Sequence, residues 1–247
     1  MSNKVKKIIL PIIISLFWIL IWFLLSLIIN NTFLFPSPIE TLKALFVLLK
    51  TQAFYKVVFY SLLRVSCGVA LGVLGGVILA INSHAFPIIR RFISPVISII
   101  KATPVVTFIV LLWISMSGNS LTVFVAFLMV MPIVWQNVLD GYSSIPKELT
   151  EVASIFEFSR RKRFKILILP VIFNYLFPAI ITSIGLAWKA EIAAEIIAYT
   201  KVSIGQYIYD ARYNLETPTV FAWVSVIVLF SILLEASTKF LLRRLKK

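Results

Sequence analysis

The stretch EVASIFEFSRRKRFKILILP, residues 151–170, places two acids and five bases in a chain that is otherwise mostly apolar. Of the 247 residues, 60% are hydrophobic and only 14% are charged. Soluble domains average about 45–50% apolar and about 25% charged residues. A soluble core cannot bury this much apolar surface, so the composition predicts an integral membrane protein in which residues 151–170 form a charged island between membrane spans.

The formal net charge of +14 would also suit a protein that binds nucleic acid. In a membrane protein, however, the same excess arises from Lys and Arg residues held in cytoplasmic loops. The bases here lie between long apolar runs and do not follow one solvated face. We therefore expect contact with membrane lipid and no nucleic-acid partner.

Six apolar segments are long enough to cross a bilayer, which predicts a single all-α transmembrane domain over residues 1–247. Their approximate bounds are 8–29, 57–81, 93–115, 121–139, 166–187 and 220–238. The first follows a basic start that resembles a signal peptide, but its 22 uncharged residues exceed a signal core and no small-residue cleavage site follows. Residues 39–50 predict a short helix at the membrane interface.

The basic residues predict the orientation of the spans. They cluster before the first span, at Arg90–Arg91, in the loop 141–165 and at the C-terminal end of the chain. With six spans, all four clusters fall on one side of the membrane. The positive-inside rule makes that side the cytoplasm, so we expect both termini and the loop 141–165 to be cytoplasmic.

Small residues recur every fourth position in the second predicted span, at Gly68, Gly72, Gly76 and Ala80. In lipid, such a face lets two helix backbones approach closely and gain dispersion contacts. The pattern predicts a packing face, and two interpretations remain open: a static contact, or an interface that slides during transport.

The fifth apolar region is longer than one simple span, because it runs from Ile166 to about Thr200. About 20 residues suffice to cross a bilayer. Pro170, Pro178 and Gly185 interrupt the region. We therefore expect a bent span that continues into a second, re-entrant or extracellular helical piece, a form tolerated where the chain lines a cavity or is buried in protein.

The charged island begins with a helix-start signal, because Ser143–Ser144 are able to cap a helix and Pro146 fits its first turn. Glu148 and Glu151 then favour the positive end of the helix dipole. A helical apolar stripe follows, formed by Leu149, Val152, Ala153 and Phe156. This short amphipathic helix either lies on lipid or its own spans, or docks in a groove of a cytoplasmic partner.

The island resembles the signature loop of binding-protein-dependent ABC importer permeases, in which Glu-Ala-Ala, three residues and Gly precede an Ile-x-Leu-Pro. Glu151-Val152-Ala153 matches the first part and Ile168-Leu169-Pro170 the last. Glu157 stands where the glycine is usual. The resemblance implies that the Glu148–Lys165 loop docks an ABC ATPase subunit, with the contact formed by Glu148, Leu149, Glu151, Val152, Ala153, Phe156 and Glu157.

Most of the chain resembles one branch of these permeases, which serves nitrate, sulfonates, taurine and bicarbonate and also includes permeases for thiamine precursors and related vitamins. The resembling stretches are FLFPSPIETLKAL (residues 33–45), the glycine-rich second span, RRFISPVISIIKATPVV (90–106) and GLAWKAEIAAEIIA (185–198). The resemblance implies a type I importer fold in a bacterial or archaeal plasma membrane. It also implies pairing with a second permease copy, and an extracytoplasmic solute-binding protein on the outer face.

The chain itself lacks the residues for several kinds of chemistry. It contains no G-x-x-x-x-G-K-[ST] loop, so ATP must be bound by partner subunits and no cofactor is expected in this chain. His84 is the only histidine and Cys67 the only cysteine, which leaves no metal site and no catalytic triad. We therefore predict a non-catalytic subunit.

Ionisable residues within apolar segments are costly and tend to face a bundle interior or an aqueous cavity. Glu191 and Glu195 share a helix face, and Lys189 points elsewhere. The candidates for the translocation path are Lys101, Lys189, Glu191 and Glu195. The alternative for the last three is a water-exposed extracellular turn, and for Lys101 and Arg64 it is a side chain that snorkels to the interface.

The sequence therefore predicts the permease subunit of an ATP-driven importer for a small solute, either a sulfonate-, nitrate- or taurine-like anion or a vitamin of the thiamine-precursor or riboflavin type. The alternative is a self-contained channel or secondary carrier. That class would show inverted internal repeats and no partner loop, and spans one to three show no convincing repeat in spans four to six.

Overall fold

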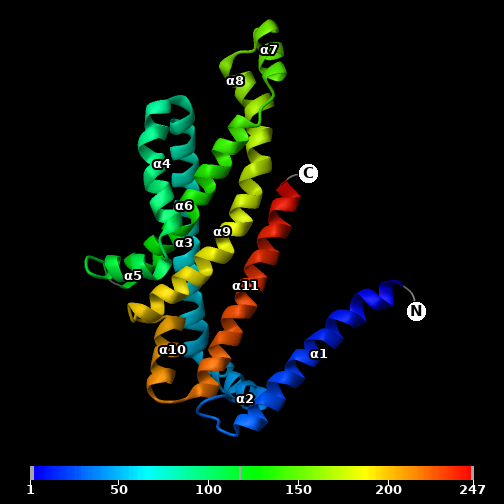
Figure 1. The fold of residues 1–247 in the computed structure, drawn as a ribbon, viewed down its shortest axis with the longest axis vertical. Coiled ribbons are helices and arrows are strands. Elements are labelled where there is room, and N and C mark those ends of the chain that lie inside the picture. The colour runs from blue at the N-terminus through cyan, green and yellow to red at the C-terminus, as the bar shows by residue number, and fades with distance from the viewer. Residues whose placement is uncertain (1–2, 117, 246–247) are drawn as a thin grey trace.

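The structure is a computed structural model that describes residues 3–116 and 118–245. Over these residues the regular elements are helical (Figure 1). The elements in chain order are α1 (Asn3–Ile29), α2 (Pro38–Leu49), α3 (Gln52–Ala85), α4 (Pro87–Ala102), α5 (Val105–Trp113), α6 (Gly118–Ser143), α7 (Lys147–Ile155), α8 (Arg160–Arg163), the π-helical turn η1 (Phe164–Ile168), α9 (Leu169–Ile197), α10 (Ile204–Tyr213) and α11 (Thr217–Leu245).

Five helical stretches in the described residues are long and apolar enough to cross a membrane, and a sixth crossing results if the bent pair α4–α5 counts as one. The five are Ile9–Ile29, Gln52–Ala85, Gly118–Ser143, Arg160–Ile197 and Thr217–Leu242. The predicted all-α, multi-pass membrane protein is therefore confirmed.

The third predicted span, 93–115, is not one straight helix. α4 and α5 meet at an angle of 102°. Thr103 has an extended backbone, with φ −83° and ψ 131°. The proline that follows explains this, because Pro104 disfavours helical geometry at the residue before it. The predicted span is therefore divided into two helices at Pro104, whereas Pro95 is accommodated inside α4.

The fifth apolar region is more continuous in the structure than the sequence predicts. We expected a break between residues 166 and 200, but α8, η1 and α9 form one helical stretch, Arg160–Ile197. The wider π-helical turn at Phe164–Ile168 ends two residues before Pro170, which has no N–H to donate to the preceding turn. Pro178 lies inside α9. The prolines therefore alter the hydrogen bonding of this helix without dividing it.

Helices α3, α6 and α9 form the centre of the bundle, and α11 and α10 lie along α9 (Figure 1). The small-residue face of α3 meets α6. A Cβ atom added to Gly72 would lie 2.6 Å from the Val130 Cβ, and one added to Gly76 would lie 2.8 Å from the Val134 Cβ. At Gly68 the neighbours are Ala126 and the Val123 carbonyl. These three glycines therefore let α3 approach α6 more closely than any larger residue would allow.

Helix α1 diverges from the rest of the bundle (Figure 1). Its residues 9–20 are all exposed in the isolated chain. Trp22 returns to the bundle, because its indole N–H donates to the Pro36 carbonyl at 3.0 Å and its ring packs on Phe221. The apolar surface of α1 suits contact with lipid or with another membrane subunit.

Candidate functional site

Two regions of the structure concentrate polar groups in ways that the membrane fold alone does not require. One is the loop between α6 and α9, which carries α7 and α8 and projects from one end of the bundle (Figure 1). The other is a buried cluster of charges between α3, α9 and α10. The loop joins the carboxyl end of α6 to the start of α9, whereas the charge cluster lies near the carboxyl end of α9. The two regions therefore lie at opposite ends of the bundle.

Helix α7 begins at Lys147, and its N-cap is Pro146 without a side-chain hydrogen bond. The predicted serine cap is therefore wrong. Instead, the Ser144 hydroxyl donates to the Gly141 carbonyl at 2.9 Å, which satisfies the end of α6. Glu148 lies in the first turn of α7, where its carboxylate favours the positive helix end.

The apolar face of α7 is largely uncovered. Leu149, Val152 and Phe156 are 47%, 46% and 71% exposed, and Ile155 is the most exposed of the group at 77%. Ala153, the centre of the predicted stripe, is buried at 5%. The sequence pattern therefore missed Ile155 and included a residue that is covered by the chain itself.

The carboxyl end of α7 is closed by a Schellman turn. The amide of Phe158 donates to the Ala153 carbonyl at 2.9 Å, and the amide of Glu157 donates to the Ser154 carbonyl at 3.0 Å. Glu157 has φ +48°, the left-handed conformation that favours glycine at this position. The turn therefore keeps the geometry that glycine usually provides, although a glutamate occupies the site.

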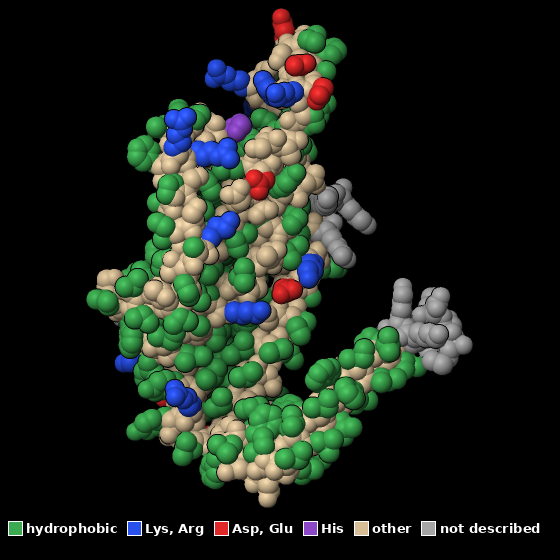
Figure 2. Space-filling view, in the orientation of Figure 1, with side chains coloured by type: hydrophobic (Ala, Val, Ile, Leu, Met, Phe, Trp, Pro, Cys, Tyr) green, Lys and Arg blue, Asp and Glu red, His purple; other side chains and the backbone are tan. Residues whose placement is uncertain are grey.

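A basic segment follows the turn. Ser159 caps α8, because its hydroxyl accepts from the Lys162 amide at 3.3 Å. Four consecutive bases, Arg160–Arg163, make up this helix. Lys and Arg side chains lie over this end of the molecule and over the start of α4, and others are scattered further along the same face (Figure 2). The loop thus presents exposed apolar and acidic residues beside a basic segment.

The buried cluster centres on Glu195, whose side chain is 0% exposed. Its Oε1 pairs with Arg64 Nη2 at 2.6 Å and accepts from the Ser61 hydroxyl at 2.7 Å. Its Oε2 accepts from the Gly205 amide at 3.0 Å, in the first turn of α10. A carboxylate at this position is favoured by the positive end of the helix dipole. One side chain of α9 therefore ties together α3 and α10.

Glu191 lies one turn before Glu195 and is also 0% exposed. Its Oε1 is 3.5 Å from Arg64 Nε, and within the described residues neither carboxylate oxygen has a hydrogen-bond partner. Two buried carboxylates therefore face one guanidinium. Glu195 holds the shorter of the two contacts with Arg64, at 2.6 Å against 3.5 Å for Glu191.

The predicted environment of Arg64 is wrong. We expected a side chain that snorkels to the interface, but Arg64 is only 5% exposed. Besides Glu195, its Nη1 donates to Asn119 Oδ1 at 3.0 Å and its Nη2 to the Val202 carbonyl at 3.1 Å. The signal available in the sequence was a charged residue inside an apolar span. Its partner, Glu195, lies 131 positions away in the chain.

The other ionisable candidates lie apart from this cluster. Lys101 and Lys189 are exposed. The alternative of a water-exposed turn is contradicted for Glu191 and Glu195, which are both buried. Lys189 is exposed, but it lies inside α9 and not in a turn. Across residues 3–116 and 118–245, no group of three or more His, Cys, Asp or Glu side chains is placed to hold a metal ion.

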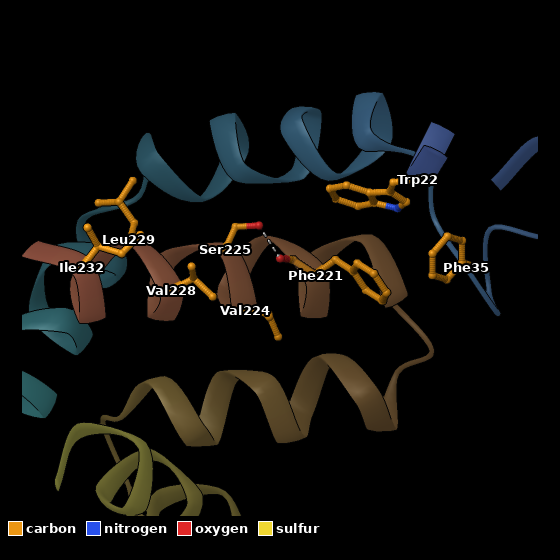
Figure 3. Close-up of a pocket in the computed structure, with 8 residues that line it drawn as sticks. All are labelled: Trp22, Phe35, Phe221, Val224, Ser225, Val228, Leu229 and Ile232. Carbon is orange, nitrogen blue, oxygen red and sulfur yellow. Dashed lines mark hydrogen bonds between the residues drawn. The ribbon is translucent and has the colours of Figure 1, made fainter. Parts of the chain in front are cut away.

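A groove beside α11 has a volume of about 490 Å³ and is lined by Trp22, Phe35, Phe221, Val224, Ser225, Val228, Leu229 and Ile232 (Figure 3). Its one hydroxyl, on Ser225, donates to the Phe221 carbonyl at 2.9 Å. The groove therefore offers apolar surface and is better suited to a lipid chain than to a polar solute.

Comparison with known proteins places this geometry in a family context. Residues 72–247 match the family described as binding-protein-dependent transport system inner membrane component. The taurine transport system permease protein TauC of Escherichia coli (strain K12) is 25% identical over 91% of this chain and 83% of its own length. The putative aliphatic sulfonates transport permease protein SsuC of Bacillus subtilis (strain 168) is 24% identical over 98% of this chain and 87% of its own.

The bicarbonate transport system permease protein CmpB of Synechocystis is 28% identical over 61% of this chain, and the match spans about half, 54%, of that relative. A bacterial ABC transporter that imports the acidic polysaccharide alginate contains a chain of similar fold, with a TM-score of 0.65, 15% identity and coverage of 99% and 98% of the two chains. For the MetNI methionine ABC transporter the TM-score is 0.59, at 14% identity and coverage of 78% and 94%.

Proposed function

The chain belongs to the family of binding-protein-dependent transport system inner membrane components, and on this premise we propose that it is the permease subunit of an ATP-driven importer. The expected fold, that of the transmembrane subunit of an ABC importer, is confirmed by the two solved transporters. The relatives named above are permeases for taurine, sulfonates and bicarbonate. We propose a small solute of that kind as the cargo.

The observation that carries the proposal is the exposed face of α7. Four large apolar side chains, Leu149, Val152, Ile155 and Phe156, are 46–77% exposed on a loop that also carries exposed charges. A charged, water-facing loop is an unfavourable place for exposed apolar side chains, and an amphipathic helix of this kind suits a groove on another protein. We propose that this face docks an ABC ATPase subunit, which binds the ATP that this chain does not.

The proposed arrangement assigns the remaining partners by side. The docking loop and both termini face the cytoplasm of a plasma membrane, as the distribution of basic residues suggests. An extracytoplasmic solute-binding protein then delivers the solute at the opposite end, near α10, and a second permease copy completes the path. In this scheme the chain is a non-catalytic subunit, and ATP binding and release in its partners select between its conformations.

Two charge insertions test the docking proposal. Ile155→Asp and Phe156→Asp place a carboxylate in the exposed apolar face without removing a core residue, because both side chains are more than 70% exposed. We expect loss of ATPase co-purification with normal membrane insertion. Tyr213→Asp is the matched control, since Tyr213 is 81% exposed at the opposite end of the bundle.

Retained co-purification in both α7 variants would contradict the docking role. Solute transport by the purified chain without any ATPase would contradict the importer proposal as a whole, because it is the behaviour of a channel or secondary carrier. Ala153 is less suitable for this test, because its side chain is buried and a charge there would disturb the loop itself.

A further inference from the structure

A cavity lies beside the buried charge cluster, at the end of the bundle opposite α7. Its volume is about 540 Å³, and its lining includes Lys56, Tyr60, Arg64, Asn119, Lys201 and Val202. These residues come from the first half of α3, the start of α6 and the connection between α9 and α10. The volume falls within the range of about 300–1,000 Å³ that is usual for small-molecule sites.

The lining has one sign of charge. Lys56, Arg64 and Lys201 are basic, and none of the residues that line the cavity is acidic. The nearby acids, Glu191 and Glu195, are fully buried behind Arg64 and do not reach the cavity. The structure therefore separates the bases that face the cavity from the two acids that face the protein interior.

The three cations have different roles. Arg64 is fixed by Glu195 and Asn119, and within the described residues its Nη1 has one acceptor, so a second N–H remains for a ligand. Lys56 and Lys201 are exposed, and among the described residues neither forms an ion pair. Two uncompensated ammonium groups beside a fixed guanidinium donor favour a negatively charged ligand.

We propose that this cavity binds a small oxyanion group, such as a sulfonate, a carboxylate or nitrate, with Lys56 and Lys201 attracting the anion and Arg64 donating to it. The inference rests on the proposed function, because it makes the cavity the site where the solute first meets the permease. It narrows that function to solutes with an anionic group and excludes neutral vitamins as the main cargo.

Binding is measured with the purified chain and its co-purifying ATPase in phosphatidylcholine nanodiscs. The probes are sodium methanesulfonate and sodium nitrate, with ionic strength held constant by sodium gluconate. Dimethyl sulfone, a neutral molecule of nearly the same size as methanesulfonate, is the control ligand. We expect saturable binding of at least one anion and none of the sulfone.

Two double variants locate the site. Removal of both exposed lysines, in Lys56→Gln/Lys201→Gln, is expected to weaken anion binding by about tenfold, since two of the three positive charges of the lining are lost. Reversal to Glu at both positions is expected to abolish it. Lys43→Gln/Lys50→Gln removes two exposed lysines of the α2 region that do not line the cavity, and its affinity is expected to equal that of the wild type.

Several results would overturn the proposal: no binding of either anion, equal binding of dimethyl sulfone, or unchanged affinity in the Lys56/Lys201 variants. Loss of anion binding when phosphatidylglycerol replaces phosphatidylcholine in the nanodiscs would also overturn it. In that case the lipid phosphate would compete for the cavity and would be its natural occupant. ATPase co-purification is recorded for the same samples. If the ATPase co-purifies but neither anion binds, the anion site is overturned and the permease proposal is not. If an anion binds but no ATPase co-purifies, the permease proposal is contradicted and the anion site is not.

Discussion

Replacement of Glu157 by glycine tests whether the turn after α7 is held in a strained conformation. Glu157 has φ +48°, and left-handed geometry costs a residue with a Cβ about 1–2 kcal/mol. Glycine avoids that cost but loses more backbone freedom on folding, worth about 0.4–1 kcal/mol. The difference predicts that Glu157→Gly stabilises the turn by about 0.5–1 kcal/mol. Glu157→Val should destabilise it, because a β-branched residue tolerates this geometry least.

The assay is hydrogen exchange of the two amides that close the turn, those of Glu157 and Phe158, which donate to the Ser154 and Ala153 carbonyls. A gain of 0.5–1 kcal/mol corresponds to exchange that is about two- to fivefold slower at Phe158 in the glycine variant. The valine variant should exchange faster than the wild type. Equal protection in all three proteins would refute the reasoning, because it would mean that the turn is not the conformation that limits exchange.

The buried cluster predicts unequal effects for its two acids. Glu195→Gln should lower the free energy of unfolding in detergent denaturation by about 1.5–3 kcal/mol, because Glu195 holds the close ion pair with Arg64 and accepts from Ser61 and Gly205. Glu191→Gln should cost less, because Glu191 makes only the 3.5 Å contact with Arg64. Gly205→Ala should cost at least about 1–3 kcal/mol in the same titration, because the added Cβ would overlap the α9 backbone at Glu195. The pKa of Glu40 is lowered by hydrogen bonds from Ser37, so its contribution is present above the ordinary value of 4.5 and is lost as the pH falls through the lower folded value. The difference in unfolding free energy between wild type and Glu40→Gln should therefore shrink as the pH falls from about 6 to about 3.5.

The membrane spans could be predicted from the sequence because length and apolarity are local properties. The prolines could not be interpreted in the same way. Pro104 ends α4 and produces a 102° bend, whereas Pro178 lies inside a continuous α9. In both cases the proline removes one backbone donor. Whether the chain bends depends on how the freed carbonyl is satisfied by neighbouring segments, and that is a property of the packed bundle.

The charge cluster marks the limit of prediction for the candidate site. Charges at positions 64, 191 and 195 inside apolar segments were visible in the sequence, and their cost signalled a specific environment. Their pairing was not visible, because Arg64 and Glu195 are separated by 131 residues. The sequence also could not show which cations face a cavity, since Lys56 and Lys201 meet only when α9 and α10 fold against α3.

The continuous helix from Arg160 to Ile197 gives the docking loop a mechanical connection to the charge cluster. At 1.5 Å per residue, its 38 residues span about 57 Å, with the Schellman turn just before one end and Glu195 near the other. The π-helical turn at Phe164–Ile168 is the place where the backbone hydrogen bonding of this stretch departs from the α-helical pattern. Because Glu195 binds Arg64 and the Gly205 amide together, α9 cannot rotate at that end unless α3 and α10 move with it or those bonds break. If α7 docks the ATPase as proposed, a rotation of α9 driven from that end is expected to move the walls of the cavity as well.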